Sequence, residues 1–318
     1  MKSLFKNCID VVESDGWLLP VRFTEKQFSC YTELPFFIRS HSPSSVVLAF
    51  KTASEKISFE YKIEGKAREW ALVDLKCNGV LVDSISLDND EGRVEFSLSG
   101  DASCEYRIYL PHLAVFYLRN IESDLPLLPV ADRSAFWLAL GDSITQGMNA
   151  KHPSSAYPSV ISDFLGVDVL NLGVGGEVFD FEKLDLAPKT PNIITVALGT
   201  NDWGLSRDVM KKNVLKYMDT LLSMYSTKNI YAILPIWRSD ENGVNDSGMS
   251  FEEQRNLIRS IMQKYPRVKI IDGYELVPHI ESYYGELVGR KVHPTDEGFL
   301  HMSLGILKRF FEDGIKYE

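Results

Sequence analysis

The sequence predicts two folds in succession: an all-β sandwich of the jelly-roll type over residues 1–130 and a doubly wound α/β sheet over residues 131–318. Short apolar segments separated by turn signals fill the first part, whereas strands alternate with amphipathic helices in the second. The segment Leu125-Pro126-Leu127-Leu128-Pro129 separates them. Its two prolines prevent helix formation and central-strand pairing, so we interpret it as a stiff linker.

Six short strands are expected in the first part, together with a hairpin turn at Asn78-Gly79. A type I′ turn needs positive φ at both central positions, and Asn-Gly is the pair that most readily supplies it. The expected strands are residues 46–50, 57–63, 70–76, 80–85, 94–98 and 106–110.

The second part contains five apolar runs of strand length, at residues 136–140, 167–172, 193–198, 230–234 and 268–271. Between the third and fourth runs, apolar residues from Val214 to Tyr225 recur on one helical face. Ser250 and Glu253 have the spacing of a capping box, which predicts that a helix begins there. Strand and helix alternation of this kind is typical of a parallel sheet covered on both faces.

Composition excludes some classes of partner. The chain has 318 residues, 45% hydrophobic content, a formal net charge of -10 and a pI near 5.2. We therefore expect neither a nucleic-acid nor a membrane partner. No apolar stretch approaches membrane-spanning length, and Asn7 and Asp10 interrupt any signal-peptide core, so we predict a cytoplasmic protein.

Four cysteines, at positions 8, 30, 77 and 104, lie in the first third of the chain. We interpret them as free thiols; in an exported protein the same even count would allow two disulfides. They form no C-x-x-C unit, and the chain has no H-x-x-x-H pair and no clustered carboxylate set, so we expect no metal and no cofactor.

Polar and glycine-rich segments follow the expected strands of the second part, at the sheet edge where open α/β folds place their sites. Glycines there permit sharp turns and close approach of the backbone to a ligand. The four segments are Gly141-Asp142-Ser143-Ile144-Thr145-Gln146-Gly147, Asn171-Leu172-Gly173-Val174-Gly175-Gly176, Gly199-Thr200-Asn201-Asp202 and Val292-His293-Pro294-Thr295-Asp296-Glu297-Gly298.

In order and spacing, these segments resemble the four blocks of the SGNH, or GDSL-type, hydrolase family, from about Phe136 to the C-terminus. The resemblance implies a flavodoxin-like sheet and an esterase site. It implies that Ser143 is the nucleophile, His293 the base, and the backbone amides of Ser143 and Gly173 with the side-chain amide of Asn201 the oxyanion hole. Taken singly, His293 is also explained as a loop residue beside a helix cap at Thr295, and Gly173 and Asn201 as turn residues.

The chain departs from the family pattern at Arg290, where most members carry an aspartate three residues before the histidine. Converting that aspartate to its amide costs a serine protease about 10⁴ in turnover, so the replacement matters. Three alternatives remain. Ser143 and His293 act as a dyad with a main-chain carbonyl accepting the Nδ1 proton; another carboxylate orients the imidazole; or the domain is inactive. The candidate carboxylates are Asp296, Glu286 and Asp272.

The order of the two parts is similar to that of two-domain carbohydrate esterases, including acetylxylan-esterase-like enzymes, which implies short acyl esters of carbohydrates as substrates. Trp203, Trp237 and Arg238 follow strands and are candidates for sugar contacts; the two tryptophans are equally explained by packing at the domain interface. A glycan-binding or scaffolding protein with a retired enzyme domain, and a thioesterase or lipase-type acylhydrolase, are the alternatives. The sequence does not indicate an oligomeric state.

Overall fold

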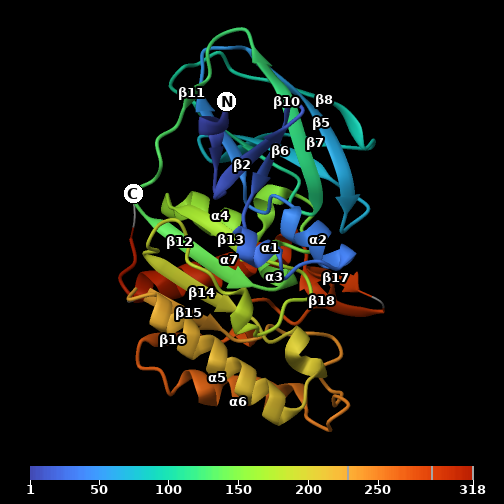
Figure 1. The fold of residues 1–318 in the computed structure, drawn as a ribbon, viewed down its shortest axis with the longest axis vertical. Helices are drawn as coiled ribbons and strands as arrows, with labels where there is room; N and C mark the ends of the chain where they lie inside the picture. The colour runs from blue at the N-terminus through green and yellow to red at the C-terminus, as the bar shows by residue number, and fades with distance from the viewer. Residues whose placement is uncertain (228, 288, 317–318) are drawn as a thin grey trace.

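The computed structural model describes residues 1–227, 229–287 and 289–316, and shows an antiparallel sandwich beside a parallel α/β sheet (Figure 1). One sandwich sheet has the order β1-β4-β9-β6-β7, with β11 also paired to β4, and the other has the order β2-β3-β10-β5-β8. The first comprises β1 Phe5–Lys6, β4 Val47–Lys51, β9 Glu105–Tyr109, β6 Leu72–Cys77, β7 Val80–Ser86 and β11 Leu128–Pro129. The second comprises β2 Asp10–Ser14, β3 Trp17–Val21, β10 Ala114–Ser123, β5 Lys56–Lys66 and β8 Glu91–Ser97.

The predicted sandwich is confirmed. Each expected strand corresponds to an observed one within a few residues, and one apolar cluster that includes Phe50, Phe59, Val73 and Phe116 fills the space between the sheets. Asn78 and Gly79 have φ of 49° and 81° and join β6 to β7, as the hairpin signal predicts.

The expected linker is partly a strand. Leu128 and Pro129 pair antiparallel with β4, on the side of β4 that also carries β1, and not between two long strands. Proline cannot donate to a ladder, which is why this pairing is short and lies at the edge. All four cysteines are free, as predicted.

The second sheet is parallel, with the order β13-β12-β14-β15-β16. This is the doubly wound, flavodoxin-like order, in which the first strand lies between the second and the third. The strands are β12 Phe136–Gly141, β13 Asp168–Gly173, β14 Ile193–Ala197, β15 Asn229–Ile233 and β16 Val268–Ile271, and a separate antiparallel hairpin consists of β17 Tyr284–Leu287 and β18 Arg290–Pro294. The carboxyl ends of β12, β13 and β14 therefore meet at the point where the chain changes direction across the sheet.

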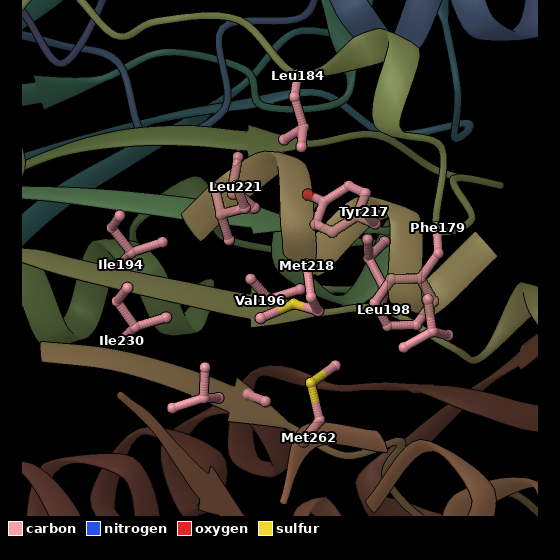
Figure 2. Packing of buried hydrophobic residues seen from close by; sticks show 14 of the residues in the cluster. Phe179, Leu184, Ile194, Val196, Leu198, Tyr217, Met218, Leu221, Ile230 and Met262 are labelled. Carbon is pink, nitrogen blue, oxygen red and sulfur yellow. The ribbon is translucent and has the colours of Figure 1, made fainter. Parts of the chain in front are cut away.

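Both faces of this sheet are covered, because alternate side chains of each strand enter different cores. Leu138 and Leu140 belong to one apolar cluster, and Trp137 and Ala139 to the other. Figure 2 shows the first cluster, in which residues of β14 and β15 lie against residues of α5 and α6. The helices are α1 Glu25–Phe28, α2 Leu34–His41, α3 Ser143–Gln146, α4 Tyr157–Leu165, α5 Arg207–Met224, α6 Phe251–Met262 and α7 Asp296–Glu312.

Two of these helices belong to the N-terminal part, where only strands are expected. Thr24 and Gln27 form a reciprocal capping box at the start of α1, a local signal that the strand pattern obscured. Helices α1 and α2 contact the α/β part (Figure 1): Gln27 of α1 donates to the Lys183 oxygen at 3.0 Å, and Gln146 of α3 donates to the Arg39 oxygen of α2 at 2.9 Å. Within the described residues, every helix is too short or too polar to traverse a lipid bilayer.

A buried arginine joins the two parts. Arg22 follows β3 and is 1% exposed, and its guanidinium donates to carbonyl oxygens of Ser42 (2.7 Å), Arg39 (3.0 Å), Gly173 (3.3 Å) and Asn171. It forms no ion pair with any carboxylate of the described residues, and burial lowers its pKa to about 9. Main-chain carbonyls from the N-terminal part and from β13 thus share one cation.

We expect Arg22→Met to lower the free energy of unfolding by about 3 kcal/mol, because several buried carbonyls lose their donor at once. Urea unfolding followed by circular dichroism measures the change. Arg93→Met is the matched control, since Arg93 of β8 is exposed and pairs with Glu122 of β10. Its unfolding curve should coincide with that of the wild type. Equal curves for all three proteins would contradict a stabilising role for Arg22.

Candidate active site

Ser143 occupies the first position of α3, directly after β12. Gly141 ends the strand at a point where any Cβ would overlap the Thr145 side chain, so only glycine permits this turn. The Asp142 carboxylate accepts from the Ile144 amide at 2.9 Å and caps the short helix. Burial raises the pKa of this carboxyl to about 7.

His293 lies on β18 and its Nε2 is 2.8 Å from the Oγ of Ser143. Both side chains are 4% exposed. After β18, the hydroxyl of Thr295 accepts from the Gly298 amide at 3.4 Å and caps α7, as predicted. The structure therefore brings together the two residues that the sequence proposed as nucleophile and base, although they are 150 positions apart.

The other ring nitrogen of His293, Nδ1, is unpaired within the described part of the chain. Nδ1 is buried, and no group among the described residues hydrogen-bonds to it. The residue at the expected aspartate position, Arg290, is instead paired with Asp240 at 3.1 Å. Asp240 also binds Arg238, so these three side chains form one charge network beside the histidine.

None of the carboxylates proposed from the sequence orients the imidazole in this structure. Asp296 accepts from the backbone amides of Lys151 and His152 at 2.9 and 3.3 Å. Asp272 pairs with Arg255 and Arg259. Glu286 accepts from Nδ2 of Asn149 at 3.4 Å, but through its backbone oxygen and not through its carboxylate. The carboxylates of Asp296 and Asp272 are engaged by other groups, and none of the three proposed carboxylates bonds to Nδ1 among the described residues.

The electrostatic field at His293 is positive. Burial is the main cause that lowers the pKa of this imidazole to about 3, and the charges of Arg68, Arg39, Arg238 and Arg290 lower it further. A neutral imidazole with its proton on Nδ1 accepts from the Ser143 hydroxyl through Nε2. The pair is therefore set for removal of the serine proton, but formation of the imidazolium is opposed.

One of the three expected oxyanion donors is contradicted by the structure. The Gly173 amide donates to Oδ1 of Asn171 at 2.9 Å, and a Cβ on Gly173 would overlap the backbone of Gln146. This glycine is needed for packing of β13 against α3 and its donor is occupied. The Ser143 amide, by contrast, has no acceptor among the described residues.

A second glycine of the same segment, which the sequence reasoning missed, has an open amide. Gly176 has φ of 90°, and its N–H meets no acceptor in the described part of the chain. The preceding amide, of Gly175, is held by Oε1 of Gln146 on α3 at 2.8 Å, which fixes this loop beside Ser143. The consecutive glycines Gly175 and Gly176 are the sequence signal for this loop, and in the structure Gly176 adopts the positive φ.

Asn201 begins the 3₁₀ turn Asn201–Gly204 after β14 and is partly exposed. Its Nδ2 donates to the backbone oxygen of Glu177 at 2.9 Å, which fixes the plane of the amide. An amide nitrogen carries two hydrogens, so one donor remains. Asp202, in the same turn, accepts from the Phe179 amide, and burial raises its pKa to about 7.

The proposed substrate-contact residues pack within the α/β part. The Trp237 ring stacks on His279 at 5.8 Å, and its Nε1 donates to Glu241. Trp203 lies edge-on to Phe251 at 5.3 Å. These contacts do not support packing of either ring against the sandwich.

Arg238 is 4% exposed, binds Asp240 through Nε and Nη2, and donates from Nη1 to the Thr200 oxygen. These bonds leave Arg238 little freedom to bind a ligand. Residues 1–227, 229–287 and 289–316 contain no cluster of three or more His, Cys, Asp or Glu side chains arranged to hold a metal.

Comparison with known proteins identifies related folds. The model of the GDSL-like lipase/acylhydrolase family matches residues 139–299. No curated protein sequence matches the chain.

Three solved structures are similar over most of their length. A salicylyl-acyltransferase, SsfX3, from a tetracycline biosynthetic pathway has a TM-score of 0.84 at 19% identity, covering 98% of this chain and 94% of that one. A putative GDSL-like lipase from Bacteroides ovatus has a TM-score of 0.68 at 18% identity, covering 93% and 90%. The acetyl xylan esterase Est2A from Butyrivibrio proteoclasticus has a TM-score of 0.63 at 14% identity, covering 95% and 97%.

We expect the His293 imidazole to remain neutral from pH 7 down to about pH 4, because its pKa is lowered to about 3. An unfolded chain binds this proton near pH 6.5, so acid favours unfolding through this residue and stability is lost as the pH falls below that value. NMR titration of the histidine side chains measures the midpoint, with the His293→Asn variant identifying the signal. A midpoint at or above 6 would contradict the positive, buried environment.

Proposed function

The chain belongs to the GDSL-like lipase/acylhydrolase family, and on this premise we propose that it is a serine esterase that removes short acyl groups, acetyl foremost, from carbohydrates. The observation that carries the proposal is the 2.8 Å contact between Ser143 Oγ and His293 Nε2 at the carboxyl edge of the sheet. Geometry of this kind permits direct proton transfer from the nucleophile to its base.

In the proposed reaction, Ser143 Oγ attacks the ester carbonyl while its proton passes to His293 Nε2. The carbonyl oxygen becomes an oxyanion, for which the amides of Ser143 and Gly176 and the remaining N–H of Asn201 are the donors. Collapse of this intermediate breaks the ester C–O bond, and His293 returns the proton to the departing alcohol. Water then attacks the acyl-serine with the same base, and releases the acid and the free hydroxyl.

The mechanism uses a dyad. Arg290 is paired with Asp240, and pairing of β18 with β17 fixes the backbone of the histidine. Burial of the ring takes over the positioning that an aspartate performs in a triad. An aspartate would also supply a negative charge that stabilises the imidazolium. No described side chain that contacts His293 supplies that charge.

Support for a carbohydrate substrate comes from the related folds. Besides the acetyl xylan esterase, a family two carbohydrate esterase from Clostridium thermocellum, solved in complex with cellohexaose, has a TM-score of 0.62. The salicylyl-acyltransferase favours a second candidate, in which an alcohol replaces water in the final step. Both candidates share the acyl-serine, and they differ in whether an added acceptor alcohol becomes acylated. An inactive glycan-binding protein and a long-chain thioesterase or lipase remain outcomes of the experiments below.

We expect Ser143→Ala and His293→Ala each to lower kcat/KM for 4-nitrophenyl acetate and an acetylated xylo-oligosaccharide by about 10⁴-fold, because nucleophile and base act as a unit. Circular dichroism checks folding, and His301→Ala is the matched control on an exposed histidine of α7. Activity that survives both site substitutions would refute the dyad, and activity only on longer acyl chains would refute the acetyl preference.

We expect Asn201→Ala to lower kcat by about 10²-fold to 10³-fold while KM changes little, since the amide acts on the oxyanion and not on the ground-state ester. Steady-state kinetics on the same substrates measures the split. Asn89→Ala, on an exposed loop of the sandwich, is the control. A rise in KM at constant kcat would show that Asn201 binds substrate and does not stabilise the transition state.

A further inference from the structure

Two arginines of the N-terminal part reach the Ser143–His293 site. Arg39 extends from α2, and its Nη1 donates to the Gly175 oxygen at 2.9 Å. A Cβ added to Gly176 would lie 3.3 Å from the same Nη1, so the guanidinium lies directly against the loop that carries the open Gly176 amide.

Arg68, from the segment between β5 and β6, reaches the opposite element of the site. Its Nε donates to Oδ1 of Asn149 at 2.7 Å. Asn149 packs against Gly285, which is the register partner of His293 in the β17–β18 hairpin. The two guanidinium groups thus approach the site from the glycine loop and from the histidine hairpin.

Neither arginine forms an ion pair in the described part of the chain, although the protein has 44 acidic and 34 basic residues. Nε and Nη2 of Arg39 and Nη2 of Arg68 have no acceptor among the described residues. Both side chains are half-buried. Burial lowers the pKa of both, and the charge of Arg39 further lowers that of Arg68, so two like charges lie near each other without a counter-ion.

The acidic side chains of the surrounding loops are already engaged. Glu177 accepts from the Tyr31 hydroxyl at 2.6 Å and binds Lys183 at 2.8 Å. Asp296 binds backbone amides, and Asp240 binds the other two arginines near His293, Arg238 and Arg290. The described part of the chain therefore supplies no carboxylate that pairs with Arg39 or Arg68, and a ligand can supply the negative charge.

We propose that the substrate carries an anionic group, a carboxylate or phosphate near the ester, which Arg39 and Arg68 bind between the glycine loop and the histidine hairpin. The planar donors of arginine match such oxyanions and bind them in two-point fashion. The inference rests on the proposed esterase function and narrows its substrates to acylated sugar acids, sugar phosphates or similar anionic esters. It makes residues of the N-terminal part determinants of specificity.

The anionic group of the substrate would also favour formation of the His293 imidazolium in the proposed reaction. An anion between Arg39 and Arg68 neutralises the positive field that opposes the His293 imidazolium. The substrate then contributes part of the negative charge that the family aspartate would supply and that Arg290 cannot.

Matched pairs of substrates test the proposal on the wild-type protein. Acetylated galacturonic acid against acetylated galactose places a carboxylate on the alcohol side, and an acetylated hexose 6-phosphate places a phosphate there. The 4-nitrophenyl hydrogen succinate and 4-nitrophenyl acetate pair places a carboxylate on the acyl side. We expect kcat/KM for an anionic member of at least one pair to exceed that for its neutral partner by about tenfold or more, and the preferred pair identifies the source of the charge.

Variants assign the effect to residues. Arg39→Met and Arg68→Met should each lower the ratio of kcat/KM for the preferred anionic ester to kcat/KM for its neutral partner by about 10-fold to 100-fold. Arg39→Lys should recover part of the loss, because it restores charge without the planar fork. Arg93→Met, on β8 of the sandwich, should leave the ratio of anionic to neutral kcat/KM unchanged. If Arg39 or Arg68 had a purely structural role, its substitution would lower kcat/KM equally for both esters.

The outcomes separate the two proposals. Hydrolysis that depends on Ser143 but shows no anionic preference in any pair would overturn the substrate inference and retain the esterase. Absence of Ser143-dependent hydrolysis on every substrate would overturn the proposed function itself. Competition by free galacturonate, inorganic phosphate and galactose against wild-type turnover gives a result that needs no variant: stronger inhibition by an anion supports the inference, and equal inhibition contradicts it.

Discussion

The buried guanidinium of Arg22 is the constraint on which the arrangement of the site depends. It binds main-chain oxygens of Ser42 and Arg39 on one side and of Asn171 and Gly173 on the other, and no carboxylate of the described residues pairs with it. A buried guanidinium whose N–H groups lack acceptors is costly, so these carbonyl oxygens have to converge on Arg22 when the chain folds. The end of α2 is thereby held against the end of β13, and Arg39 is carried to the glycine loop.

A second link transmits this placement to the nucleophile. Gln146, on α3, accepts from the Gly175 amide and donates to the Arg39 oxygen. Asn171 donates to Thr145 of α3 and to Ser45 of the N-terminal part, while its oxygen accepts from Gly173. Helix α3 with the nucleophile, the glycine loop and helix α2 are therefore joined by hydrogen bonds, and the N-terminal part is bonded directly to elements of the site.

The charge distribution explains how this chain differs from the family pattern. Replacement of the usual aspartate by Arg290 leaves Nδ1 of the imidazole without an anionic partner among the described residues, and Arg290 is itself paired with Asp240. The positive potential at the ring comes from Arg68, Arg39, Arg238 and Arg290, and the N-terminal part contributes the first two. A neutral, buried base in a cationic site favours a substrate that brings its own negative charge.

Local pattern determined most of the fold. Strand periodicity, the Asn78-Gly79 turn, the Ser250 capping box and the order of the four segments depend on residues close in sequence, and each is found as predicted. Pairing of Ser143 with His293 was expected from the resemblance to the family and not from strand position, because His293 lies on β18 of a separate antiparallel hairpin. Hydrogen-bond partners could not be predicted from the sequence. Gly173 ends β13 and Gly176 comes shortly after it, and only the contacts of Gly173 with Asn171 and α3 show which of the two amides is open. Tertiary structure likewise decided the partners of Arg290 and Asp296 and the positions of Arg39 and Arg68 at the site. The partners of these residues lie far away in the chain, so which groups pair is determined only when the chain packs.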